Sequence, residues 1–376
     1  ISSTKPLIKN KNKNKNIATS SLASHHLYNL VSIHNLIGDQ IHSFITMSSS
    51  KSFLHSFIIY LSTAIILLKS FLINNIFTLT RSSIVFAIID TSFSIYFQLC
   101  GLTSVTIDID DQTTLHFWTS RHRKFQKPNL VMIHGYGGDA RWQFLYQIGF
   151  LATKFNLYMP DLLFFGKSYS NRSGRTDEFQ AKCLVEGMRR LGVGTYSVYS
   201  ISYGGYVAYR MAEMCGSDEM EKLVIVSSGV GWNDEDAKRE KVRKIGRDPK
   251  ELLVPDNPKD LRLLVKLAVY KGKPLRWIPD FILQEFINVM GNNHRKEKIE
   301  LVEYLLAKKP DSELAVLTQE TLLVWGDQDD VFPVSLAYQL QRHLGSKSRV
   351  EIMKDIGHAV NVESPHALNR IITSFI

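Results

Sequence analysis

From residue 105 onward the chain alternates between short apolar runs and stretches long enough to form a helix. Val105–Ile109 alternates apolar and polar side chains as a strand does, and Leu115–Trp118 follows after a polar turn, so a hairpin is expected. Uninterrupted apolar runs, typical of strands buried on both faces, then recur at Leu130–Ile133, Leu157–Met159, Tyr196–Ile201, Leu223–Val226, Leu322–Trp325 and Val350–Met353. The pattern predicts an α/β fold with a mostly parallel central sheet flanked by helices, within a domain spanning residues 101–376.

The interval between Val226 and Leu322 is too long for a single crossover connection between neighbouring strands. Helical spacing of apolar residues recurs there in four stretches: Glu235–Ile245, Leu261–Val269, Pro279–Met290 and Lys298–Lys308. We therefore expect a helical cap of about residues 233–317, inserted into the sheet domain.

Residues 1–46 differ from the rest of the chain. Lys9–Asn16 alternates lysine and asparagine without apolar periodicity, so residues 1–46 are predicted to be disordered. The first methionine is Met47, and we hypothesise that translation of the native protein starts there.

An apolar N-terminal region follows at residues 47–100. Phe53–Leu68 contains no formal charge, and apolar side chains continue beyond Lys69. Residues 53–79 are therefore expected to form a membrane anchor, which would place the protein at an endomembrane. The alternatives are a cleaved signal and a helix packed on the protein. Ser83–Leu99 predicts an amphipathic helix that lies on a membrane or on the protein, because Asp90 argues against a second span.

Charge and cysteine content exclude several functional classes. The net charge is +9, but residues 101–376 hold 37 Lys and Arg against 34 Asp and Glu, so the predicted domain is nearly balanced. Basic side chains do not cluster with aromatic ones, so no nucleic-acid partner is expected. The three cysteines are too scattered for a disulfide framework or a cysteine-based metal site.

Ser202 lies where a predicted strand meets a predicted helix. Tyr196–Ile201 has the pattern of a strand, and Tyr203–Ala212 has that of a helix that begins with small residues. A serine in so tight a turn projects from the sheet edge, where the helix N-terminus stabilises a developing anion. Gly204 supplies the small residue required two positions later, and Ser200 stands two positions earlier, where glycine is usual.

Two further segments contain partners for this serine, in the chain order Ser, Asp, His. A carboxylate just past the strand Thr321–Trp325 can orient a histidine on the next loop, and Asp327, Asp329 and Asp330 all qualify. His358 follows a strand and a glycine, and it is therefore the candidate base.

A glycine-rich loop follows the strand Leu130–Ile133. Its glycines Gly135 and Gly137 let the main-chain N–H of Tyr136 point at a substrate oxygen, together with the N–H of Tyr203. The loop lacks the Gly-Lys-Ser/Thr ending of a phosphate loop and does not continue as Gly-x-Gly-x-x-Gly.

These motifs together resemble those of the capped α/β-hydrolases of plants, over about residues 104–376. The matching segments are His134–Gly138, Pro160–Ser168, Ser202–Gly205, Trp325–Asp329 and Gly357–His358. In that family the acid lies three residues after the strand-end glycine, which selects Asp329. Phe165 departs from the family, which usually has glycine there, and it is expected to narrow the site entrance.

The resemblance extends to membrane-associated monoacylglycerol lipases and to hydrolases that cleave C–C bonds. It implies a serine hydrolase in which Ser202, His358 and Asp329 form the catalytic triad, with no metal or organic cofactor. Apolar residues of the cap, Trp277 and Phe281 among them, favour a small-molecule ester or lipid substrate with an apolar acyl chain. C–C hydrolysis, thioester hydrolysis and a non-enzymatic ligand receptor stay open, whereas epoxide hydrolysis would need Asp in place of Ser202.

Overall fold

The computed structural model describes residues 80–232, 234, 240, 242–272, 275–307 and 314–376, with side chains from Ile84 onward. The expectations for residues 1–46 and for an anchor at residues 53–79 lie outside this range. Within it, no helix combines the length and apolarity needed to cross a membrane.

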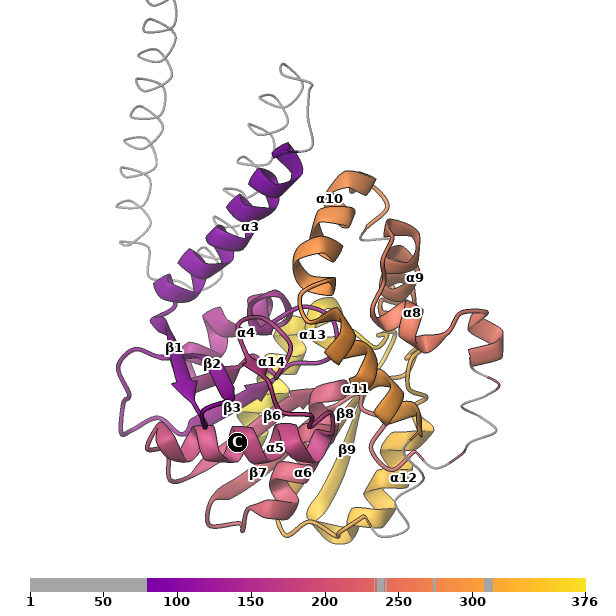
Figure 1. The fold of residues 1–376 in the computed structure, drawn as a ribbon. Helices are drawn as coiled ribbons and strands as arrows, with labels where there is room; N and C mark the ends of the chain where they lie inside the picture. Colours follow the sequence, from indigo (N-terminus) through magenta and orange to yellow (C-terminus); the bar gives the residue numbers. More distant parts are fainter. Residues whose placement is uncertain (1–79, 233, 235–239, 241, 273–274, 308–313) are drawn as a thin grey trace, which may run out of the picture. The chain divides into compact units, whose positions relative to one another are not determined.

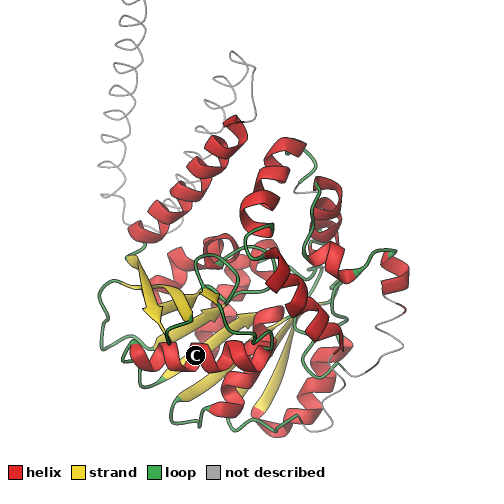
Figure 2. Ribbon diagram, viewed as in Figure 1, coloured by secondary structure: helices red, strands yellow, loops and turns green. Residues whose placement is uncertain are grey.

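A nine-stranded sheet forms the centre of the described region (Figures 1 and 2). Its strands are β1 (Leu102–Asp108), β2 (Thr113–Ser120), β3 (Asn129–Ile133), β4 (Asn156–Pro160), β5 (Tyr169–Ser170), β6 (Tyr196–Ile201), β7 (Met220–Val226), β8 (Glu320–Gly326) and β9 (Ser348–Met353). The order is β1-β2-β4-β3-β6-β7-β8-β9, with β5 paired to β2. Strands β1 and β2 form the expected antiparallel hairpin, and β4, β3, β6, β7, β8 and β9 are mutually parallel. The predicted α/β fold is confirmed.

Helices cover both faces of this sheet, because successive side chains of a strand point to opposite faces. Val198 of β6 packs in the core cluster with residues of α5 (Asp177–Arg190) and α6 (Tyr203–Met214). The next residue, Tyr199, instead meets Phe144 of α4 (Ala140–Lys154), with ring centroids 5.5 Å apart. Because both faces of the sheet are buried, nearly every side chain of a parallel strand is apolar. This explains the continuous apolar runs in the sequence.

The remaining helices fall into two groups. α12 (Ser335–Leu344), the 3-10 turn η2 (Gly345–Lys347), α13 (Val360–Glu363) and α14 (Pro365–Phe375) belong to the sheet domain. The segment between β7 and β8 contains α8 (Pro249–Leu253), α9 (Pro258–Ala268), α10 (Asp280–Phe286), the π-helical turn η1 (Ile287–Gly291) and α11 (Arg295–Ala307). Three of the four stretches expected to be helical therefore contain these helices, and in the first, Glu235–Ile245, the described residues 240 and 242–245 are helical as well.

Helix α3 (Thr80–Leu99) packs against the sheet domain. Phe93 and Phe97 are among its buried side chains, and the Phe97 ring meets the Trp118 ring of β2 at 5.3 Å. Tyr96 fits beside Gly149 of α4, where a Cβ would lie 2.6 Å from the Tyr96 hydroxyl oxygen. Of the two positions expected for this helix, the structure shows the one on the protein.

Candidate active site

Ser202 occupies a strained turn between β6 and α6. Its φ of 53° and ψ of −119° lie in a region that residues with a side chain rarely adopt. The turn is tight because the chain passes β3 closely: a Cβ on Gly204 would lie 2.5 Å from the main-chain oxygen of Ile133. The conformation lifts the Ser202 side chain off the sheet edge.

Ser202, His358 and Asp329 are joined by two hydrogen bonds. His358 Nε2 lies 2.9 Å from Ser202 Oγ, and His358 Nδ1 lies 2.9 Å from Asp329 Oδ2. Asp329 also accepts hydrogen bonds at Oδ1 from the main-chain N–H groups of Val331 and Phe332, so its carboxylate is fixed on both oxygens. A carboxylate at Nδ1 favours the tautomer in which Nε2 accepts the serine proton.

The other two aspartates of this turn have different surroundings. Asp327 accepts a hydrogen bond from the main-chain N–H of Ile356 at 3.4 Å, and Asp330 has an exposed side chain on the cavity wall. Of the three candidates, only Asp329 hydrogen-bonds to His358 in the structure. Its role as the catalytic acid stays a prediction.

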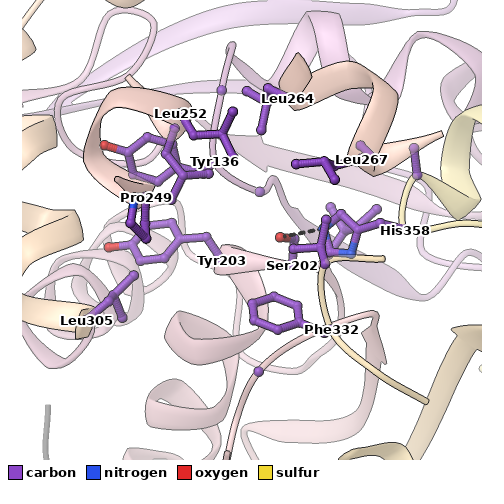
Figure 3. Close-up of a pocket in the computed structure, with 18 of the residues that line it drawn as sticks. Tyr136, Ser202, Tyr203, Pro249, Leu252, Leu264, Leu267, Leu305, Phe332 and His358 are labelled. Atoms are coloured by element: carbon purple, nitrogen blue, oxygen red, sulfur yellow. Dashed lines mark hydrogen bonds between the residues drawn. The ribbon is translucent and has the colours of Figure 1, made fainter. Parts of the chain in front are cut away.

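The glycine-rich loop His134–Gly138 lies directly against Ser202. A Cβ on Gly135 would lie 3.0 Å from Ser202 Cβ, which explains why the loop needs a residue without a side chain there. Tyr136 and Tyr203 lie on the same side of Ser202 (Figure 3), with their ring centroids 5.7 Å apart. Among the described residues, the main-chain N–H of Tyr136 has no backbone acceptor, and that of Tyr203 has none outside its own helix.

Gln143, in the first turn of α4, holds this loop in place. Its Oε1 accepts from the N–H of Gly135 at 2.7 Å, and its Nε2 donates to the carbonyl oxygens of Gly135 and Gly137, each at 2.9 Å. The peptide of Tyr136 is thus bracketed by hydrogen bonds on both sides. Sequence reasoning missed Gln143, because a glutamine in a helix carries no signal of such a role.

Buried side chains pack against the glycine-rich loop His134–Gly138 and hold it in place. The Tyr136 hydroxyl donates to the main-chain oxygen of Lys298 in α11 at 2.6 Å. His134 accepts from the N–H of Leu162 at Nε2, and burial lowers the pKa of its imidazole, which favours the neutral form that this bond requires. Burial likewise raises the pKa of the Tyr136 phenol well above its ordinary value.

The two departures from the family pattern are both accommodated. Ser200 is fully buried, and its hydroxyl donates to the carbonyl oxygen of Val224 at 3.1 Å, so the expected turn forms without a glycine there. Phe165 does not narrow the entrance as expected. It is buried beneath the loop, with its ring 5.1 Å from that of Tyr136, and it does not line the main cavity.

An apolar cavity of about 590 Å³ opens above Ser202 and His358. Leu252, Leu264, Leu267 and Leu305 from the cap contribute to its wall, and Phe332 lies below His358 (Figure 3). Both arginines that line the cavity are paired: Arg247 with Asp260 at 3.3 Å, and Arg210 with Glu213 at 2.7 Å. Such a cavity fits a ligand with a long apolar part.

Trp277 and Phe281, which were expected to contact the substrate, are not part of this wall. Trp277, in the turn before α10, is 84% exposed. Phe281 is 52% exposed, because α10 turns Leu283 inward instead, where it packs with Leu261 and Ile287. The expectation was wrong, since cap helices carry apolar residues on more than one face and the sequence does not tell which face is inward.

Known proteins resemble this chain over the same region. A model of the alpha/beta hydrolase family matches residues 130–371. The monoacylglycerol lipase ABHD6 of Bos taurus is 24% identical over 271 residues, which cover 69% of this chain and 78% of that protein. Lipase 3 of Moraxella sp. (strain TA144) is 25% identical over 241 residues, covering 62% of this chain and 73% of the lipase.

Solved structures agree on the fold. The crystal structure of a membrane phospholipase A, described as a bacterial virulence factor, superposes with a TM-score of 0.64 at 21% identity, covering 86% of this chain and 97% of that one. These relatives include animal and bacterial proteins, so the expected plant source rests on the sequence resemblance alone.

Proposed function

Because the chain belongs to the alpha/beta hydrolase family, we propose that it is a serine hydrolase that cleaves carboxylic esters with an apolar acyl chain. One observation carries the proposal: Ser202, His358 and Asp329 are linked by two 2.9 Å hydrogen bonds at the base of an apolar cavity. A nucleophile, a base and an orienting carboxylate in this arrangement are the groups that acyl transfer needs.

In the proposed reaction, Ser202 Oγ attacks the ester carbonyl carbon while His358 Nε2 takes its proton. Asp329 keeps the imidazole in the required tautomer and stabilises its charged form. The N–H groups of Tyr136 and Tyr203 donate to the oxyanion of the tetrahedral intermediate, and Tyr203 adds the positive end of the α6 dipole. The alcohol leaves with the proton from His358, and water then releases the acid from Ser202 by the same steps.

Monoacylglycerols are the substrate class that we favour. The cavity wall is mostly apolar, with leucine and valine as its commonest residues, which suits an acyl chain. The relatives named above are called monoacylglycerol lipase, lipase and phospholipase. A wall of aliphatic side chains selects for chain length and not for a polar head, so short-chain esters should react with a higher KM.

An acyl-length series tests the substrate class. Monoacylglycerols and 4-nitrophenyl esters of increasing chain length are compared with a thioester and a C–C substrate for wild type, Leu264→Trp and Trp277→Ala. The larger ring of Leu264→Trp should raise KM for long chains about tenfold and leave short chains little changed. Trp277→Ala should behave as wild type, because that ring lies outside the cavity. Turnover of the thioester or C–C substrate above that of every ester would contradict the proposal.

We also propose that the protein associates with membranes through its N-terminal region. Residues 53–79 are mainly apolar in sequence, and α3 leaves Ile84, Ile88, Ile95 and Leu99 about half exposed on its outer face. After a carbonate wash, the full-length protein should stay in the membrane fraction, and a variant that begins at residue 80 should be found in the supernatant. Full-length protein found entirely in the supernatant would contradict this part of the proposal.

A further inference from the structure

Helix α3 is bonded to the first turn of α4. The Arg141 guanidinium lies 2.8 Å from Asp90 Oδ2, and the same Nη1 atom donates to Ser94 Oγ at 2.7 Å. The indole N–H of Trp142 points at the other oxygen of Asp90, at 3.4 Å. The exposed fraction is 9% for Arg141 and 29% for the Asp90 side chain, so these polar contacts are partly shielded from water, which makes them stronger than contacts at a fully exposed surface.

Aromatic rings strengthen the same junction. The Trp142 ring stacks on Phe86 at 5.5 Å with an interplanar angle of 10°, and the edge-on Phe93 ring lies at 4.8 Å. On the cap side, the Phe286 ring of α10 lies 5.2 Å from Trp142. Because Trp142 itself lines the cavity, α3 forms an outer layer behind part of the cavity wall.

The first turn of α4 is also what holds the glycine-rich loop. Asp139 caps this helix by accepting from the N–H groups of Arg141 and Trp142, and its carboxylate is 2.7 Å from the Arg141 guanidinium. One residue further on, Gln143 makes its three hydrogen bonds to Gly135 and Gly137. A shift of this turn would therefore move the peptide of Tyr136.

We propose that α3 is a positioning element of the active site, in which Asp90 and Ser94 act through Arg141 on the turn that holds the Tyr136 peptide. The inference rests on the proposed serine hydrolase function. Asp90 is not part of the cavity wall, so it can act on the reaction only through the two residues that it holds, Arg141 and Trp142. A displaced oxyanion donor lowers the rate of the chemical step more than it weakens ground-state binding.

The test compares the full-length chain with Asp90→Asn and with the matched control Glu186→Gln. The control removes one partner of an exposed ion pair of 2.7 Å, with Arg190, far along the chain from the junction. Active sites are first counted by titration with a fluorophosphonate. Then kcat per titrated site, KM and the rate of phosphonylation are measured on one medium-chain ester, and melting curves report folding.

Asp90→Asn should lower kcat per titrated site and the phosphonylation rate together by about tenfold, with KM changed less than about twofold. Glu186→Gln should match wild type in all three quantities. A variant with fewer titratable sites but wild-type kcat per site would show a merely structural role and overturn the inference.

Ser94→Ala provides a milder second variant, because it removes only the hydroxyl that accepts from Arg141. It should lower kcat per titrated site and the phosphonylation rate by about threefold. If Asp90→Asn does not fold, this variant tests the positioning role of α3. Wild-type rates in a folded Ser94→Ala protein would then overturn the inference. A wild-type protein that is neither labelled nor active would overturn the proposed function instead, and the inference with it.

Discussion

Gln143 forms two hydrogen bonds with a single residue, Gly135: it accepts from the N–H at 2.7 Å and donates to the carbonyl at 2.9 Å. Neither bond involves a group that reacts, yet together they orient the peptide that leads into Tyr136. The proposed oxyanion donor Tyr136 is therefore held by a side chain seven residues further along the chain.

Replacing this amide by a carboxylate should slow the reaction. Gln143→Glu keeps the size of the side chain but removes the donor to Gly135 and Gly137 and places a negative charge by their carbonyl oxygens. We expect kcat to fall about tenfold or more with KM nearly unchanged. Gln284→Glu, at a half-buried cap residue that also donates to a main-chain carbonyl oxygen, is the matched control. Equal kinetics for the two variants would show that the loop keeps its geometry without Gln143.

The three aspartates after β8 should differ sharply on conversion to asparagine. Asp329→Asn should reduce kcat by about three orders of magnitude, because an amide at this position no longer favours the reactive tautomer of His358. Asp327→Asn and Asp330→Asn should keep kcat within about threefold, since neither hydrogen-bonds to the imidazole. The steady-state rates of all three on one ester decide the assignment, and a larger loss in Asp327→Asn than in Asp329→Asn would refute it.

Crowding at the Ser202 turn predicts a stability cost for any side chain at residue 204. In Gly204→Ala the new methyl group would meet the main-chain oxygens of Ile133 and His134 at 2.5 and 2.6 Å, and backbone cannot move aside cheaply. We expect the free energy of unfolding in urea to fall by about 2 kcal/mol or more. Gly194→Ala is the control, because nothing lies within 4 Å of its added Cβ. A similar loss of unfolding free energy in the two variants would contradict the close approach of residue 204 to the main chain of β3.

Lys298 gives the stability a pH dependence. Burial, with a contribution from nearby Arg295, lowers the pKa of its ammonium group from 10.5 to about 8. Between these two values the unfolded chain binds more protons than the folded one, so stability rises with pH there and is lost as the pH falls through 8. Lys298→Met should therefore be more stable than wild type by about 2 kcal/mol at pH 7.

This advantage of Lys298→Met should shrink as the pH is raised from 8 to 10, where wild type has gained its own stability. Lys296→Met, on the same helix with an 85% exposed side chain, should show no such trend. Urea unfolding of wild type and the two variants at pH 7, 8, 9 and 10 measures these differences in stability. An advantage that stays constant across this range would mean that Lys298 titrates as an exposed lysine.

The strands could be read from the sequence because their environment is uniform. A parallel strand with helices on both faces has only apolar neighbours, so runs such as Leu322–Trp325 stand out without any knowledge of the fold. The order of Ser202, Asp329 and His358 is equally visible, because each lies within five residues of the end of a strand. Parallel strands bring their carboxyl ends to one edge of the sheet.

The sequence does not show which face of a helix turns toward the protein. Helix α3 is apolar on two sides, burying Phe93 and exposing Ile95, so periodicity alone left both a membrane and the protein as partners. The expectation for Phe281 failed for the same reason, whereas Trp277 lies in the turn before α10. Gln143 acts through the main chain of a loop, and contacts of that kind leave no pattern of residue types.

The central claim is that Ser202 is the nucleophile, and active-site labelling tests it most directly. Full-length wild type is treated with a fluorophosphonate, digested, and the modified residue is located by mass spectrometry, with Ser202→Ala and Ser200→Ala in parallel. We expect one adduct, on Ser202, and loss of labelling and ester turnover in Ser202→Ala by several orders of magnitude, with melting unchanged. Ser200→Ala should still be labelled, because the Ser200 hydroxyl is buried against Val224. An adduct on any other serine, or wild-type turnover by Ser202→Ala, would contradict the account.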